Sequence, residues 1–537
     1  MRIIHRYQVL SYLPVFLMAL LLKIGFCLVA IAVPMNMMAF FTDNLHLGSG
    51  LVSFAPEVWL SLLALVLGTL IIVITIASEK TPRLIDLFVT DYSSRLYLWI
   101  ITLSGLENTG FQVVQFTQST VLSNIIFINS FILLPGCVLL AIPYIFYILK
   151  YTRSHDVIDR IYDECVLLIG QATKQRSRRS IEHYQVKLIE NINELHDLLQ
   201  YTQFKRPKAH IISLFGKLLG EYIDLKPQIS PLMMRLSSPI KNDISFRNQE
   251  EKHQSIELSR LLLEQKVLSV LANSFLLLNR EGHYDLASAC GNELYLMGKK
   301  AVERNDSKLT ELTIKWFNTF FRHSINQALR SSEVRNIYNL IYHYHKMVQL
   351  LIHSGQYQQV MVCARYLYYY GLEASKHAQE ESSFSFLVDV LANELKSILI
   401  SIHEASFAKI EQYQLITYLN ALCQQEEMAY RPKANNSPQI IQLTLCLYYI
   451  SKQEYELLDK VAHAVLLTSS YKLDPQKLKK DCDRIRHEPE DFWEETDHAN
   501  TNIYYSPHKH LIPNLMQVLR EKQLEESGNS YKIRGDD

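Results

Sequence analysis

The chain lacks a net charge and holds little glycine or proline. Its 537 residues include 54 Lys and Arg against 54 Asp and Glu, with 17 Gly and 16 Pro. Balanced charge argues against nucleic acid as a partner, since nucleic-acid-binding proteins usually carry a basic excess. The low glycine and proline content excludes collagen-like and low-complexity classes. The length favours a folded chain of more than one domain.

Motifs for catalysis, cofactors and metals are also missing. The sequence has no phosphate-binding Gly-x-x-x-x-Gly-Lys-Ser/Thr, no His-Glu-x-x-His and no Gly-x-Ser-x-Gly. Its 8 cysteines form no Cys-x-x-Cys. The C-terminal histidines His498, His508 and His510 follow no known metal-ligand spacing. We therefore predict no cofactor, no metal and no enzymatic activity.

Charge is scarce in residues 1–150. This part holds 13 charged residues, about 9%, against 95, about 25%, in the remaining 387. The uncharged runs 58–77 and 108–149 are long enough for membrane helices, which need about 20 apolar residues each. The run 9–41 carries only Lys23 and is too long for the apolar part of a signal peptide. We predict a four-span transmembrane domain in 1–150, with the first span uncleaved.

Basic residues between the predicted spans set the orientation. They precede the first span, follow the second and follow the fourth, whereas the loop 42–57 has none. Basic loops stay in the cytoplasm. We therefore predict a multi-pass protein of the lipid bilayer with both termini in the cytoplasm and a cytosolic body from residue 151 onward.

Two ionisable residues, Lys23 and Glu107, fall inside the first and third predicted spans. Both would lie roughly 16 Å deep at ~1.5 Å per helical residue. A charge at that depth is costly unless it is paired or hydrated, so it marks a candidate functional site. One hypothesis is an intramembrane polar pair that lines a path. The alternative is that Lys23 reaches back to the membrane surface and Glu107 ends a short span.

Two further segments precede the main body. Residues 151–225 predict juxtamembrane helices with a basic cluster that faces anionic lipid or, equally, solvent. Residues 226–254 contain three prolines, which helix interiors exclude, and predict a linker. The basic cluster consists of Lys174, Arg176, Arg178 and Arg179.

The predicted linker contains the pattern Arg-x-x-Ser-Pro-x-x-Asn-Asp. With the four spans, residues 1–260 resemble an uncharacterised bacterial family of predicted membrane proteins, although Ile240 and Ile244 replace a Gly and a Pro of its pattern. The resemblance implies a bacterial inner membrane and brings no activity. Ser-Pro and Asn-Asp favour turns, so the motif is either a turn between helices or a ligand site. Its residues are Arg235, Ser238, Pro239, Asn242 and Asp243.

An internal repeat begins after residue 255. Residues 277–301 and 350–374 share nine identities at an offset of 73, including Gly282 with Gly355 and Tyr284 with Tyr357. The offset is about two units of 36 residues, near the period of tetratricopeptide repeats, whose Trp-x-x-Leu-Gly start is absent. We predict helical hairpins over 255–485, with the glycine permitting each turn and the tyrosine covering it. A C-terminal cap and tail follow at 486–537.

These features predict an all-α chain with four transmembrane helices followed by a cytosolic α-solenoid of helical hairpins. One interpretation is a membrane-anchored scaffold that binds a protein partner on the repeats, because repeat stacks present extended concave surfaces. The alternative is a channel, transporter or transport regulator with a polar third span. That alternative requires a homo-oligomer, since four helices rarely enclose a path. An enzyme or sensor of unrecognised type is a third interpretation.

Overall fold

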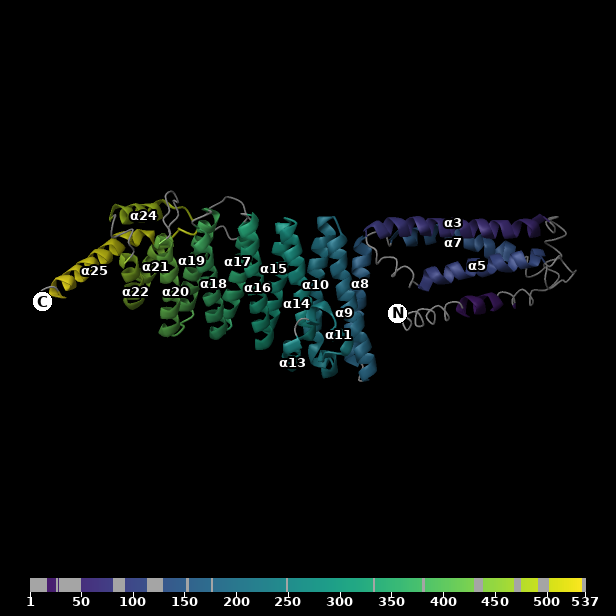
Figure 1. Ribbon diagram of the computed structural model, residues 1–537, viewed down its shortest axis with the longest axis horizontal. Coiled ribbons are helices and arrows are strands. Elements are labelled where there is room, and N and C mark those ends of the chain that lie inside the picture. Colours follow the sequence, from purple (N-terminus) through teal and green to yellow (C-terminus); the bar gives the residue numbers. More distant parts are fainter. Residues whose placement is uncertain are drawn as a thin grey trace. The chain divides into compact units, whose positions relative to one another are not determined.

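A computed structural model describes most of the chain (Figure 1), and every regular element in the described part is a helix. The all-α prediction is therefore confirmed for those residues. The described residues are 17–25, 28, 50–80, 92–113, 129–150, 154–174, 177–247, 250–331, 334–378, 382–428, 438–467, 475–490 and 502–533.

The chain divides into two compact units. Unit 1 comprises Met1–Glu164 with Asp197–Pro207, and unit 2 comprises Cys165–His196 with Lys208–Asp537. The boundary predicted at Lys150 from the change in charge content is therefore displaced. The reason is that the first turns of helix α8 (Ser154–Lys174) belong to unit 1 although their composition is polar.

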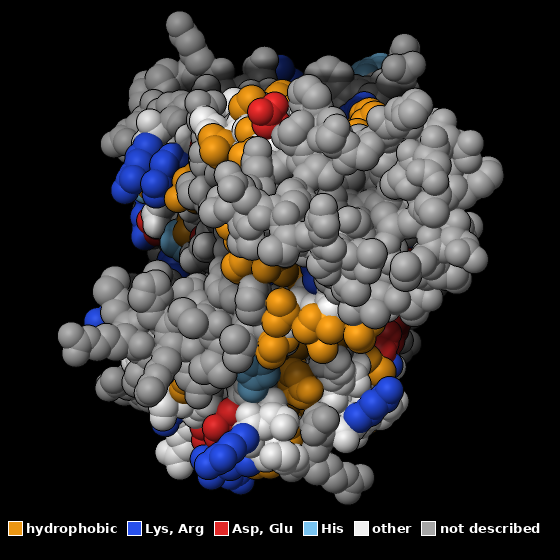
Figure 2. Space-filling view, turned by 90° about the vertical axis from the view of Figure 1, so that its right-hand side faces the viewer, with side chains coloured by type: hydrophobic (Ala, Val, Ile, Leu, Met, Phe, Trp, Pro, Cys, Tyr) orange, Lys and Arg blue, Asp and Glu red, His pale blue; other side chains and the backbone are white. Residues whose placement is uncertain are grey.

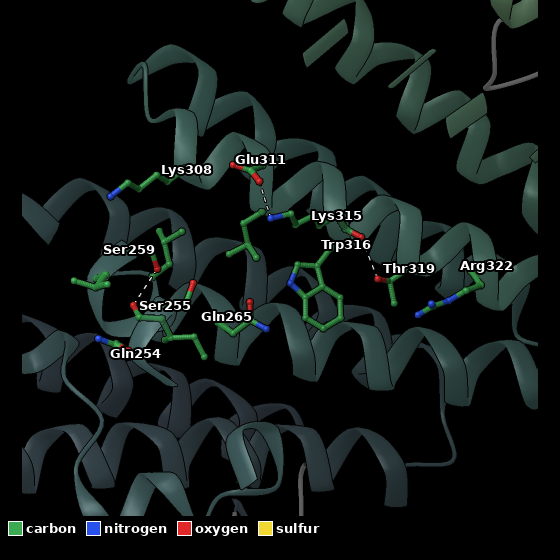
Figure 3. A pocket seen from close by; sticks show the side chains of 14 residues that line it. Gln254, Ser255, Ser259, Gln265, Lys308, Glu311, Lys315, Trp316, Thr319 and Arg322 are labelled. Atoms are coloured by element: carbon green, nitrogen blue, oxygen red, sulfur yellow. Dashed lines mark hydrogen bonds and ion pairs between the residues drawn. The ribbon is translucent and has the colours of Figure 1, made fainter. Parts of the chain in front are cut away.

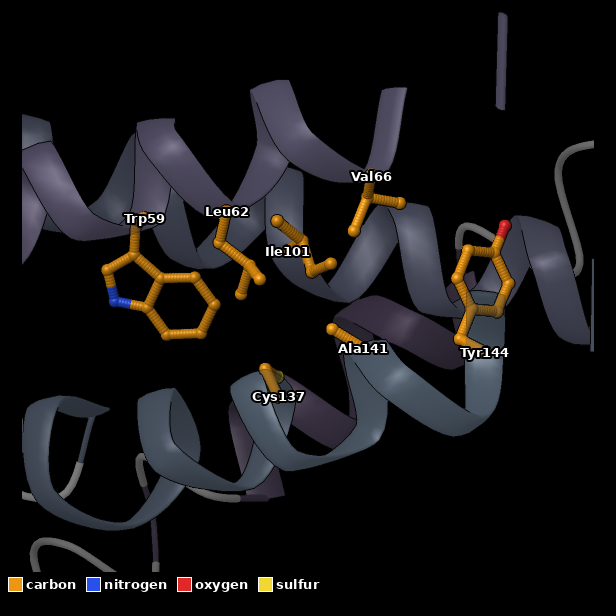
Figure 4. Close-up of a cluster of buried hydrophobic side chains, with 7 residues drawn as sticks. All are labelled: Trp59, Leu62, Val66, Ile101, Cys137, Ala141 and Tyr144. Atoms are coloured by element: carbon orange, nitrogen blue, oxygen red, sulfur yellow. The ribbon is translucent and has the colours of Figure 1, made fainter. Parts of the chain in front are cut away.

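Unit 1 is built around a small apolar core. Its described helices are a segment at 17–25, α3 (Gly50–Lys80), α5 (Tyr92–Val113), the π-helix η1 (Asn129–Leu133) and α7 (Leu134–Lys150). The core side chains come from α3, α5 and α7, which converge on one point (Figure 4). They are Trp59, Leu62 and Val66 of α3, Ile101 of α5, and Cys137, Ala141 and Tyr144 of α7.

Among the described residues, no single helix has both the length and the hydrophobicity expected of a membrane span. The shorter helical stretches Glu57–Ile72 and Leu134–Phe146 are apolar, and His253–Ser259 meets the criterion only together with Leu262–Arg280, across a bend of 118°. The four predicted spans are thus not confirmed. Within the fourth predicted span, the described part changes from π-helix to α-helix and holds Pro143, which removes a backbone hydrogen bond.

Unit 2 contains a stack of antiparallel helices, seen as a row in Figure 1. Each helix from α14 to α20 packs against the next helix and the one after it, which is the contact pattern of a helical-repeat solenoid. The helical hairpins predicted over 255–485 are therefore present. The helices are α14 (Leu262–Arg280), α15 (Tyr284–Glu303), α16 (Ser307–Ser331), α17 (Arg335–His353), α18 (Tyr357–His377), α19 (Ser382–Glu404), α20 (Lys409–Met428), α21 (Pro438–Lys452) and α22 (Tyr455–Leu467).

The two repeat turns share one backbone conformation. Gly282 and Gly355 have φ of 74° and 68°, values that glycine adopts without a steric cost. The following amide reaches back five residues, from His283 to Leu278 at 2.8 Å and from Gln356 to Leu351 at 3.0 Å. This is the Schellman arrangement, which satisfies carbonyls left open at the end of a helix. Ser406 and Gln453 occupy the same left-handed position, each with φ of 58°.

The residues shared at the offset of 73 also pack alike. A Cβ on Gly298 of α15 would lie 2.6 Å from Met347 Sδ, and one on Gly371 of α18 would lie 2.8 Å from a Leu422 methyl carbon. Both distances are too short for a real contact, so both glycines allow helices to approach closely. The residues that the repeat shares therefore serve two structural purposes: a glycine allows each turn, and a second glycine allows two helices to approach closely.

Residues 226–254 are not the linker that we predicted. They form the 3₁₀-helices η2 (Lys226–Gln228) and η3 (Pro231–Met234), followed by α11 (Ser238–Lys241) and α12 (Ile244–Arg247); α13 (Glu250–Ser259) begins in the same segment. Leu236, Ile240 and Phe246 are buried against α9 (Arg178–Tyr201) and α14. The prolines limit helix length, but the apolar residues between them supply a core that a linker would lack.

The C-terminal end closes the stack with polar contacts. The Tyr504 hydroxyl donates to Asp389 Oδ2 of α19 at 2.7 Å, and Lys396 Nζ of the same helix donates to the Ile503 carbonyl at 3.3 Å. Helices α24 (Pro475–His487) and α25 (Ile512–Ile533) both pack on α21. The cap and tail predicted at 486–537 stay a prediction, and residues 491–501 and 534–537 of that range lie outside the described residues.

Candidate functional site

A polar cluster joins three helical segments of unit 1. Lys23 Nζ of the helix 17–25 donates to Glu107 Oε2 of α5, and also to Asn129 Oδ1 of η1 at 3.2 Å. Asn129 Nδ2 in turn lies 3.4 Å from Glu107 Oε2. Lys23 is only 8% exposed, so its ammonium group does not reach the surface of the unit. The structure therefore brings together the two ionisable residues that we predicted as a pair and adds Asn129, which sequence reasoning missed.

In the helices that hold this cluster, several polar side chains are buried and several large apolar side chains are exposed, which is unusual for a water-soluble domain. Ser104 and Asn108 of α5 are buried, whereas Ile71, Leu139 and Phe146 are 62%, 72% and 68% exposed. Residues 1–150 supply 19 of the 32 large hydrophobic residues exposed in the described part of the chain. Figure 2 shows hydrophobic side chains on the surface of this region. Contiguous exposed apolar surface marks a contact with lipid or protein.

The Arg-x-x-Ser-Pro-x-x-Asn-Asp motif builds the two short helices of the 226–254 segment. Ser238 begins α11 with Pro239 in its first turn, and Asn242 ends it; all three are exposed. Arg235 is exposed too, and its carbonyl accepts a hydrogen bond from Gln185 Nε2 at 2.6 Å. The motif therefore forms a tight turn that connects the short helices α11 and α12.

Asp243 is the motif residue with the strongest tertiary contacts. Its carboxylate accepts hydrogen bonds from Lys266 Nζ at 2.6 Å and from Asn193 Nδ2 at 2.9 Å, and it caps α12 by accepting from Ser245 N at 2.9 Å. Burial alone would raise the pKa of this carboxyl, but the three donors together hold its pKa below the usual value. These contacts tie α9, α12 and α14 together.

The other predicted positions are surface features. Lys174 and Arg179 are exposed, and Arg178 Nε donates to Glu182 at 2.9 Å. Arg176 lies outside the described residues. At the repeat turns, Tyr284 begins α15, while the ring of Tyr357 packs edge-on against Phe407 of the next turn, with 4.2 Å between centroids.

A groove on unit 2 was not predicted. It has a volume of about 1040 Å³ and lies between α13, the start of α14 and α16 (Figure 3). Helix α16 lines it with Lys308, Lys315 and Arg322, each seven residues from the next, and with Trp316. This spacing is visible in the sequence. The opposing wall, formed by residues between Gln254 and Gln265, is not visible in the sequence, because only helix packing brings it beside α16.

No protein-family model and no curated protein sequence matches the chain. The resemblance to the bacterial membrane-protein family therefore stays a prediction. Among solved structures, the chain is similar to a circular tandem repeat protein described as having novel repeat topology and enhanced subunit contact surfaces. The TM-score is 0.38 at 14% identity, covering 88% of this chain and 99% of that one. At this score the helical-repeat assignment rests on the contacts within unit 2.

Proposed function

We propose that the protein is a membrane-anchored scaffold. In this proposal residues 1–150 of unit 1 lie in the inner membrane of a bacterium with both termini in the cytoplasm. The tetratricopeptide-like repeats of unit 2 then bind a protein partner at the cytosolic face.

The observation that carries the membrane part is the inverted polarity of unit 1. A lysine–glutamate pair with an asparagine is buried between helices, while leucine, isoleucine and phenylalanine side chains are exposed. Water would oppose this arrangement, because each exposed aliphatic side chain keeps an unfavourable contact with solvent. Hydrocarbon favours it, because ionisable groups in a membrane face the bundle interior and pair with one another.

The repeat architecture supports the scaffold part. Solenoids offer long surfaces in which each repeat contacts only its neighbours, so partner-binding side chains can vary without disturbing the core. Unit 2 has such a surface, and the groove beside α16 is a concave part of it.

Carbonate extraction of bacterial membranes that carry the full-length chain tests the anchor. We expect the chain to remain in the membrane pellet at high pH and a C-terminal epitope to be labelled only after the cells are permeabilised. Release into the supernatant would contradict membrane embedding. Labelling of intact cells would contradict the orientation.

Site-specific photo-crosslinking in the full-length chain tests the scaffold. A photoreactive residue replaces one position on each of three repeat helices: the partly exposed Leu312 of α16, which lines the groove, and the exposed Tyr369 of α18 and Ile410 of α20. We expect a discrete adduct with one second protein from at least one position. The absence of a protein adduct from all three would count against partner binding by the repeats.

A channel or transporter is the alternative, and the buried Lys23–Glu107–Asn129 cluster favours it. A homo-oligomer of unit 1 would then place this cluster along a polar path. Glu107→Gln is expected to abolish a flux measured in reconstituted vesicles. An unchanged flux would remove the reason for this proposal.

A further inference from the structure

The groove on unit 2 carries an excess of positive charge. Its lining has three basic residues, Lys308, Lys315 and Arg322, and one acidic residue, Glu311. Lys315 pairs with Glu311 at 2.6 Å, whereas Lys308 and Arg322 form no ion pair within the described part of the chain. The groove therefore holds two cations without a carboxylate.

The cations form a straight row. Residues seven apart lie two helical turns apart on one face, so Lys308, Lys315 and Arg322 extend along roughly 21 Å of α16 at ~1.5 Å per residue. The Lys315–Glu311 pair is 65% and 62% exposed, and such surface pairs are worth at most ~1 kcal/mol. An incoming carboxylate can therefore replace Glu311 at little cost.

Apolar surface accompanies this row. Trp316 projects into the groove between α16 and α14 (Figure 3) and is partly exposed. Leu258 on the opposite wall is 72% exposed. Tryptophan is enriched among the residues that contribute most to protein–protein binding, so Trp316 in this groove is a candidate contact for a protein partner.

We propose that this groove binds an acidic amphipathic segment of the partner protein, with carboxylates spaced to match the basic row and an apolar side chain placed against Trp316. The proposal rests on the scaffold function proposed above and names the kind of partner. A helical segment of about fourteen residues has the length of the row. Nucleic acid fits less well, since its phosphates need denser positive charge than three cations over ~21 Å.

Peptide selection on the full-length protein in detergent tests the proposal. A library of random 16-residue peptides is selected on the natural chain and depleted on the Lys308→Glu/Arg322→Glu variant. The strongest peptide is then measured by fluorescence anisotropy, beside a copy with every Asp and Glu changed to Asn and Gln. Lys479→Glu/Lys480→Glu on α24 is the matched control, because both residues are exposed and the change in net charge is the same.

We expect the selected peptides to be rich in Asp and Glu. Binding should weaken at least ~10-fold in the Lys308→Glu/Arg322→Glu variant and for the amide copy, and also in Trp316→Ala, but not in the control. If the first variant fails to fold, Lys308→Gln/Arg322→Gln replaces it.

Neutral or basic peptides, or equal losses in the groove and control variants, would overturn the proposal. So would single-stranded RNA that binds the groove more tightly than the peptides. Photo-crosslinked adducts at other repeat positions, together with selected peptides that are not rich in Asp and Glu, would be compatible with the scaffold function. This outcome would reject only the proposal that the groove binds an acidic segment. Adducts from no repeat position would count against the scaffold itself.

Discussion

In unit 1 the Lys23–Glu107 pair lies inside and aliphatic side chains such as Ile71 and Leu139 lie outside. In unit 2 the core is apolar, with Phe317 and Phe320 fully buried, and most ion pairs lie at the surface. The same kinds of side chain occur in both. What differs is the number of large apolar side chains at the surface, since residues 1–150 supply 19 of the 32 that are exposed in the described part of the chain.

The space around the glycines also differs between the two units. In unit 1 a Cβ on Gly68 or Gly136 would meet nothing within 4 Å, whereas in unit 2 a Cβ on Gly298 or Gly371 would collide with a neighbouring helix. The helices of unit 2 are therefore closely fitted at defined points. Those described in unit 1 leave room beside these two glycines.

The largest effect is expected from the buried ion pair of unit 2. Lys266→Met leaves the buried Asp243 carboxylate without its cation. Removing one partner of a buried pair costs about 3–5 kcal/mol, so the free energy of unfolding in urea should fall by that amount. Lys299→Met, which removes an exposed pair with Glu303, should cost at most ~1 kcal/mol. A similar small loss for Lys266→Met would show that Asn193 and Ser245 suffice to hold Asp243.

A buried lysine without a carboxylate contact should make unit 2 dependent on pH. Burial lowers the pKa of Lys396 to about 8, and its hydrogen-bond partners are Thr444 and the Ile503 carbonyl. Above pH 8 the folded state loses this proton while the unfolded lysine keeps it to ~10.4, so stability should rise between these values by on the order of 3 kcal/mol. Lys396→Met should be more stable at pH 7 and lack the rise. Thermal melts across this range measure both, and an unchanged slope in the variant would assign the rise to other groups.

The difference between the glycines is directly testable. Gly298→Ala should destabilise unit 2 by about 1–3 kcal/mol, since the new methyl group overpacks the contact with Met347 and Thr313. Gly136→Ala in unit 1 should be neutral or stabilising by up to ~1 kcal/mol, because alanine favours the helix. Thermal unfolding of both variants measures the contrast. Equal destabilisation would remove this distinction between the units.

The smallest effect is expected at a repeat turn. Gln453 has the left-handed conformation that Gly355 has in a sister turn. Gln453→Gly should relieve the strain of its side chain and stabilise unit 2 by roughly 0.5 kcal/mol after the entropic cost of glycine. Gly355→Gln is the reverse change and should destabilise. Chemical denaturation of the two variants tests the pair, and changes of the same sign would contradict a shared turn design.

Local patterns accounted for much of unit 2. The helical hairpins predicted over 255–485 are observed, for example as α16 and α17, because apolar spacing and turns depend on neighbouring residues only. The prolines of residues 226–254 predict a linker, and the local pattern does not show that Leu236, Ile240 and Phe246 are buried. Those residues become a core only when α9 and α14 are beside them.

The helical character, the 73-residue repeat and its glycine turns can be read from the sequence, because they depend on local hydrogen bonds and on backbone conformation within a few residues. The meeting of distant groups depends on the packing of whole helices. Lys23 and Glu107 are 84 residues apart, and Asp243 meets Asn193 across 50. The groove beside α16 exists only because α13 lies opposite it. Such contacts depend on how whole helices pack, and no spacing within one helix specifies that.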